Sequence, residues 1–132
     1  MEKLLEFEVS AVIPATPEEL YRAWLDSELH TAMTGGEAVV SAELGGEFSA
    51  WDGYISGSNL ELTPAERIVQ SWRTMEFDDN EGDSRVTISF AVVEGGTQIT
   101  IVHADLPPHG TQYIQGWEDH YFTPMCAYFG DG

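Results

Sequence analysis

The chain has 132 residues, 42% of them hydrophobic, and its 23 acidic and 5 basic side chains give a formal net charge of −18. Since folded domains cluster near about 100–150 residues, we expect a single domain over residues 1–132. The charge excludes the basic surface that binding to nucleic acid or to an anionic membrane requires, so we expect neither as a partner.

The cysteine content and the N-terminus bear on the compartment. The single cysteine, Cys126, cannot form an internal disulfide, and no cysteine cluster offers a zinc site. The segment Met1–Glu8 has acidic residues where a signal peptide has an apolar run, which predicts a cytoplasmic protein. Because salt relieves repulsion among carboxylates, a salt-rich source cell is one hypothesis, and an ordinary acidic cytosolic protein is the other.

The first predicted elements are a strand and a helix. Apolar side chains alternate with polar ones over residues 5–13, with the period of a half-buried strand. Thr16, Pro17 and Glu19 then match a capping box with proline at the first helical position. The apolar stripe that follows predicts a helix that breaks near Ser27.

The middle of the chain has the pattern of strands separated by turns that contain glycine pairs. The predicted strands cover residues 37–41, 47–52, 54–62, 67–76, 85–93 and 97–106. The last two alternate most regularly, and Glu94-Gly95-Gly96 joins them, which predicts a hairpin.

After Pro107-Pro108 the apolar spacing becomes helical. The stripe consists of Ile114, Trp117, Tyr121, Met125 and Tyr128. Pro124 removes one backbone hydrogen bond, so we expect a kink or a break in the last two turns, with Gly130 ending the helix. This order of elements is typical of an α+β fold in which a curved sheet wraps the final helix.

Several residue strings carry a resemblance to a known family. They are Gly116–Phe122 preceded by Gln115, Gly45–Gly57, Ile68–Arg73 and Gly96–His103. In this order they resemble the activators of the ninety-kilodalton heat-shock protein ATPase, a branch of the START-like or birch-pollen-allergen-like superfamily.

The resemblance implies a helix-grip fold: a curved antiparallel sheet of about six to seven strands around a long C-terminal helix, with one or two short helices after the first strand. It also implies a space between sheet and helix, and a chaperone as a partner. The eukaryotic activators carry a further N-terminal domain that grips the chaperone, for which 132 residues leave no room. A co-chaperone or protein-interaction module is therefore the alternative hypothesis rather than the leading one.

No motif for catalysis, metal or nucleotide binding is present in the sequence. The four histidines, His30, His103, His109 and His120, have no metal-ligand spacing, and Gly53–Gly57 misses the hydrolase elbow pattern by one position. Glycine-rich phosphate loops are absent. We therefore expect no catalytic residue, no metal and no cofactor.

The aromatic residues cover more apolar area than a solid core of this size needs, although such stripes also pack against one another. The leading hypothesis is a non-enzymatic protein that binds a small apolar or aromatic ligand between the sheet and the C-terminal helix. The predicted ligand-binding residues are Phe48, Trp72, Phe90, Ile101, His103, Trp117 and Tyr121.

His103 alternates with Ile99 and Ile101 and is therefore predicted to face inward, as a polar group that orients the ligand. A histidine at the edge of the core with satisfied hydrogen bonds is the alternative. A third functional hypothesis is a small cyclase-type enzyme that uses His103 or a buried carboxylate as its base.

Overall fold

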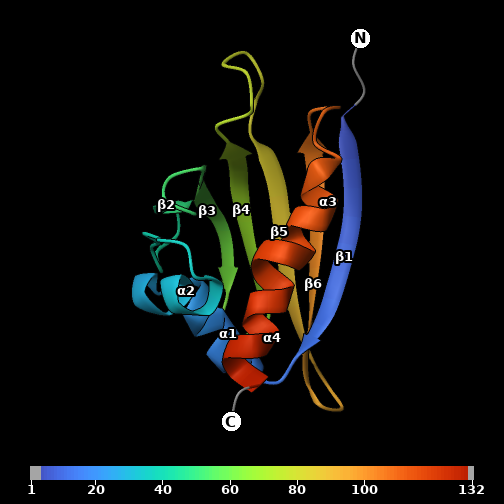
Figure 1. Ribbon diagram of the computed structural model, residues 1–132. Coiled ribbons are helices and arrows are strands. Elements are labelled where there is room, and N and C mark those ends of the chain that lie inside the picture. The colour runs from blue at the N-terminus through green and yellow to red at the C-terminus, as the bar shows by residue number, and fades with distance from the viewer. Residues whose placement is uncertain (1–3, 131–132) are drawn as a thin grey trace.

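The computed structural model describes residues 4–130, so Lys3 and the start of the Met1–Glu8 segment lie outside the described part of the chain. One antiparallel sheet curves along one side of a C-terminal helix, and two short helices lie at one end of it (Figure 1). The predicted α+β helix-grip fold is confirmed. The elements are β1 (Leu5–Ile13), α1 (Pro17–Trp24), α2 (Ser27–Thr34), β2 (Glu47–Ala50), β3 (Ile55–Thr63), β4 (Arg67–Thr74), β5 (Ser84–Val93), β6 (Gly96–Leu106), α3 (Gln112–Trp117), the π-helical turn η1 (Glu118–Phe122) and α4 (Thr123–Gly130).

The six strands lie in the order β1-β6-β5-β4-β3-β2, so the first strand pairs with the last. The β5–β6 hairpin runs in unbroken register from Arg85 opposite Ala104 to Val93 opposite Gly96. Alternate residues of β4, β5 and β6 are buried, as expected for a sheet with one covered face. The covered face meets the C-terminal helix (Figure 1).

The predicted break near Ser27 separates two helices. Thr16 accepts a hydrogen bond from the Glu19 N–H while the Glu19 carboxylate accepts from the Thr16 N–H, which completes the capping box of α1. Asp26 then caps α2 by accepting from the Leu29 N–H. A new N-cap directly after the first helix accounts for the break.

The predicted strand at residues 37–41 is wrong. Only Val39 pairs there, in a single bridge to Ser49. Side chains of α2 take the neighbouring backbone groups instead: the Ser27 hydroxyl accepts from the Val40 N–H, and the Thr31 hydroxyl accepts from the Ala38 N–H. These bonds occupy the groups that a strand would offer to a partner.

The C-terminal helix changes its winding before Pro124. In η1 the Thr123 N–H donates to the Glu118 carbonyl, five residues back. Pro124, which has no N–H, is the second residue of α4. The disturbance predicted at Pro124 is thus a widened turn just before it, and α4 continues to Gly130, the last described residue.

Candidate functional site

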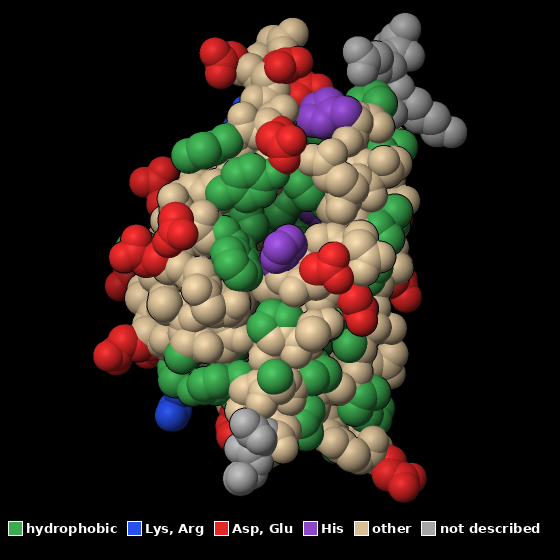
Figure 2. Space-filling model, in the orientation of Figure 1, with side chains coloured by type: hydrophobic (Ala, Val, Ile, Leu, Met, Phe, Trp, Pro, Cys, Tyr) green, Lys and Arg blue, Asp and Glu red, His purple; other side chains and the backbone are tan. Residues whose placement is uncertain are grey.

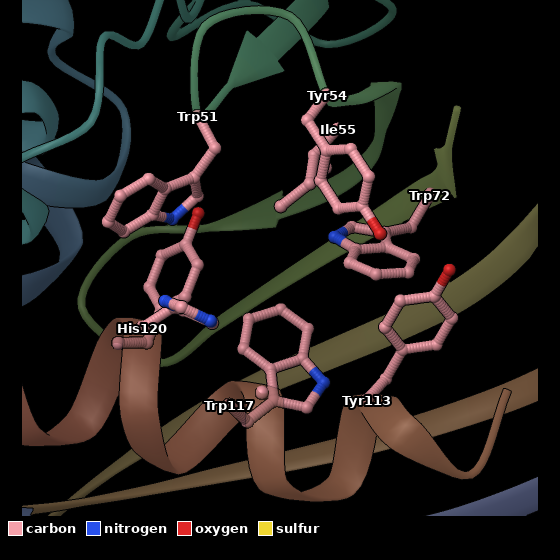
Figure 3. A pocket seen from close by; sticks show the side chains of 9 residues that line it. Trp51, Tyr54, Ile55, Trp72, Tyr113, Trp117 and His120 are labelled. Carbon is pink, nitrogen blue, oxygen red and sulfur yellow. The ribbon is translucent and has the colours of Figure 1, made fainter. Parts of the chain in front are cut away.

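A pocket of about 300 Å³ opens between the first half of the C-terminal helix and the β2–β4 side of the sheet (Figure 3). In the space-filling view it is a hollow lined by apolar side chains (Figure 2). Its nine lining residues are Trp51, Tyr54, Ile55, Trp72, Tyr113, Gly116, Trp117, His120 and Tyr121.

The helical wall follows from sequence spacing. Tyr113, Gly116, Trp117, His120 and Tyr121 fall at i, i+3, i+4, i+7 and i+8, which places them on one face of the helix. A Cβ added at Gly116 would meet no atom within 4 Å, so this position leaves open space in the wall. The absence of a side chain at Gly116 therefore contributes directly to the pocket's volume.

The opposite wall depends on a tight turn between β2 and β3. Trp51, Asp52 and Gly53 have φ values of 52°, 57° and 87°, three left-handed residues in succession. This conformation is unfavourable for non-glycine residues. It brings the Trp51 ring against His120, with 5.2 Å between the ring centroids, and against Gly36, where a Cβ would lie 2.3 Å from the indole.

His103 lies behind the pocket, bonded to its wall. The Trp117 Nε1–H donates to His103 Nδ1 at 3.1 Å, so the ring proton resides on Nε2, which is 2.8 Å from the Ser84 hydroxyl. Ser84 in turn donates to the Trp72 carbonyl at 2.7 Å. Burial lowers the pKa of His103 to about 3, so the ring is neutral and holds Trp117 in place.

A second buried histidine supports Tyr121. His30 Nδ1 lies 2.9 Å from the Trp24 carbonyl, which only accepts, so Nδ1 carries the proton and Nε2 accepts from the Tyr121 hydroxyl at 2.9 Å. Burial lowers the pKa of His30 and raises that of Tyr121. The Trp24 indole N–H in turn donates to the Gln70 side-chain oxygen at 3.3 Å.

Three of the seven predicted ligand-binding residues line the pocket: Trp72, Trp117 and Tyr121. The other four lie elsewhere in the core. Phe48 covers Gly57, Phe90 packs near Tyr21 of α1, and Ile101 sits in the centre of the sheet opposite Ile88. His103 faces inward as predicted, but both of its ring nitrogens are engaged by protein groups, as in the alternative interpretation.

Six lining residues fall outside the predicted set: Trp51, Tyr54, Ile55, Tyr113, Gly116 and His120. The three that lie on the helix, Tyr113, Gly116 and His120, could have been found by extending the helical spacing from Trp117 and Tyr121 in both directions. Trp51 and Tyr54 depend on the left-handed turn, for which the sequence contains only the single glycine Gly53.

The described residues offer no site for a metal ion at this pocket. No group of three or more histidine, cysteine or acidic residues that could hold a metal exists among residues 4–130. The cyclase hypothesis names His103 or a buried carboxylate as the base, and both ring nitrogens of His103 are bonded to protein groups. Within the same residues no helix is long and apolar enough to cross a membrane.

Comparison with known proteins assigns the family. The family model "Activator of Hsp90 ATPase homolog 1-like protein" matches residues 14–130. The chain belongs to this family. The human activator of 90 kDa heat shock protein ATPase homolog 1 is 33% identical over 118 residues, 89% of this chain and 35% of that protein. A Dictyostelium discoideum homologue is 33% identical over 94 residues, 70% of this chain and 24% of its own length.

The chain therefore spans about a third or less of the length of these curated relatives. Two solved structures match nearly its whole length. An HSP90 activator from Plasmodium falciparum superposes with a TM-score of 0.83 at 26% identity, covering 96% of both chains. Protein CV1439 from Chromobacterium violaceum gives a TM-score of 0.73 at 28% identity, covering 92% of this chain and 94% of that one.

Proposed function

We propose that this domain binds a small apolar or aromatic ligand, without transforming it, in the pocket between the sheet and the C-terminal helix. The observation that carries the proposal is the open space of about 300 Å³ between aromatic walls. Such concave apolar sites are where small ligands bind in most proteins. The hydrogen bonds to Trp117 and Tyr121 hold two of the walls in fixed orientations, which lowers the cost of ordering them around a ligand.

Gly116 provides the test. In the variant Gly116→Leu a side chain enters the pocket from the helix, whereas Gly116→Ala adds only one methyl group there. Both replacements favour the helix by up to about 1 kcal/mol relative to glycine, so neither is expected to unfold it. N-phenyl-1-naphthylamine, an uncharged dye that fluoresces in apolar surroundings, serves as the probe.

We expect saturable dye binding to the wild type, little change in Gly116→Ala and a loss of at least tenfold in affinity in Gly116→Leu. The melting temperature of each variant, measured in parallel, separates a filled pocket from a damaged fold. A wild-type protein that binds no dye at micromolar concentration, with Gly116→Leu indistinguishable from it, would refute the proposal.

A second candidate function is interaction with a chaperone ATPase. Membership of the activator family and the 33% identity to the human protein support it. The test is a pull-down of the cognate chaperone at low and at high salt, followed by its ATPase rate with and without the domain. Recovery of nothing at either salt concentration would refute this candidate, and Gly116→Leu would show whether the pocket takes part.

A further inference from the structure

We propose that the ligand of this pocket is an organic cation, in particular a quaternary ammonium group that carries an aromatic or other apolar substituent. The inference rests on the proposed ligand-binding function and specifies the chemical class of the ligand. Three features of the structure support it: the composition of the walls, a carboxylate bonded to a lining residue, and the charge around the opening.

The walls have the chemistry that recognises such cations. Six of the nine lining residues are tryptophan or tyrosine, and no lysine or arginine is among the nine. The faces of aromatic rings are electronegative and attract a cation that lies within about 6 Å of the ring centre. An ammonium ion whose hydrogens are all replaced by carbon has no hydrogen bonds to lose in so apolar a space.

The rings surround the space rather than forming one flat stack. Trp117 lies 5.7 Å from Trp72 at an interplanar angle of 38° and 5.0 Å from Tyr121 at 50°. Trp72 meets Tyr113 at 5.0 Å and 81°. The pocket view shows Trp51 and Tyr54 facing this group from the β2–β3 turn (Figure 3). A cation between these walls would meet several rings at once.

A carboxylate is bonded to the lining of the pocket. The Tyr54 hydroxyl donates to Glu76, and the Gln112 side-chain amide donates to the same carboxylate at 3.0 Å. Glu76 thus links the sheet wall to the start of the helical wall. Burial and the Glu76 hydrogen bond both raise the pKa of Tyr54, which keeps this phenol protonated and donating outward. The Glu76 carboxylate therefore lies one hydrogen bond away from a residue that lines the pocket.

The surroundings of the opening also favour a positively charged ligand. In the space-filling view acidic side chains lie around the hollow, and no lysine or arginine borders it (Figure 2). The net charge of −18 adds a long-range potential that concentrates cations and repels anions. A neutral apolar molecule would gain nothing from this field.

The test uses two ligands of the same shape. Phenyltrimethylammonium and tert-butylbenzene differ in a positively charged nitrogen in place of a carbon. An ordinary apolar pocket prefers the hydrocarbon, because the cation must be desolvated. Calorimetry or NMR titration at low salt should instead show the cation binding the wild type at least as tightly as the hydrocarbon.

Glu76→Gln keeps an oxygen that accepts from Tyr54 and removes the charge. We expect it to weaken cation binding about three- to tenfold and to leave tert-butylbenzene unchanged. Glu94→Gln, an exposed position in the β5–β6 turn, is the matched control and should alter neither affinity. An equal loss for both ligands in Glu76→Gln would indicate a structural effect and overturn the inference.

The two proposals fail in different ways. If tert-butylbenzene binds and phenyltrimethylammonium binds more than tenfold more weakly, the site is an ordinary apolar pocket, the proposed function stands and the cation inference falls. If neither ligand binds, both fall.

Discussion

His103 acts on the pocket without being part of its surface. It accepts from the Trp117 indole and reaches the Ser84 hydroxyl, so it fixes a wall residue from behind. It is a positioning residue, and its neutral form is required, because a protonated ring has no acceptor for the indole N–H.

The stability of the protein should reflect this requirement as pH falls. The pKa of His103 is about 3 when folded, against about 6.5 in an unfolded chain. Between these pH values the unfolded state binds more protons than the folded state. The contribution of His103 to the free energy of unfolding is therefore complete above about pH 6.5. It is lost toward pH 3 by up to about 1.4 kcal/mol per pH unit.

Urea unfolding of the wild type and of His103→Gln between pH 7 and pH 4.5 measures this effect. The advantage of the wild type over the variant should shrink as pH decreases. His109→Gln is the control, since His109 is exposed and pairs with Glu81, which raises its pKa and gives the opposite sign. A difference between wild type and His103→Gln that stays constant with pH would contradict the argument.

At the residue scale the sequence allows only part of the site to be predicted. Alternation along β5 and β6 correctly places Phe90, Ile101 and His103 on the inner face. The alternation does not show where along that face a pocket remains under the helix, because this depends on the position of the helix over the sheet. Trp72, Trp117 and Tyr121 lie at the open end, and the other four predicted residues do not.

Among the elements, β3 and β4 leave no room for a side chain at Gly57. A Cβ at this position would lie 1.8 Å from the Ser71 carbonyl oxygen, which is backbone and belongs to the paired strand. Gly57→Ala should therefore destabilise the protein by about 1–3 kcal/mol or more, because the two strands must move apart.

Chemical unfolding of Gly57→Ala against Gly82→Ala checks this expectation. Gly82 lies in the loop before β5, and a Cβ there would meet nothing within 4 Å, so its replacement should change stability by less than about 0.5 kcal/mol. Equal stability of the two variants would show that the strands separate without cost.

Most elements could be predicted from local pattern, and the exceptions have identifiable causes. The β5–β6 hairpin and the α1 cap are encoded by neighbouring residues, which is why their boundaries agree within one or two positions. Residues 37–41 alternate like a strand, but hydroxyls of α2, which the strand pattern does not take into account, occupy their backbone groups. The widened turn η1 lies just before Pro124, where the sequence predicts a disturbance of the helix but not its form.

For the molecule as a whole, the net charge of −18 determines how stability depends on salt. Between about 0.01 M and about 1 M salt the Debye length falls from about 30 Å to about 3 Å, which screens the repulsion among surface carboxylates. The melting temperature should rise by several degrees over this range. Equal effects of NaCl and KCl would identify screening as the cause, whereas an unchanged melting temperature would contradict the salt-rich hypothesis.

The segment of residues 35–46 is held by side-chain hydrogen bonds and by isolated backbone bonds, among them the bridge between Val39 and Ser49. Ser27 and Thr31 bind it from α2, and Asn59 donates to the carbonyls of Ser41 and Glu43. Since no continuous strand pairing spans it, this stretch can detach while the sheet remains folded. A protease should therefore cut the native chain here first. The fragments before and after the cut would remain associated, because β1 in the first pairs with β6 in the second, without interruption from Phe7 to Ile13.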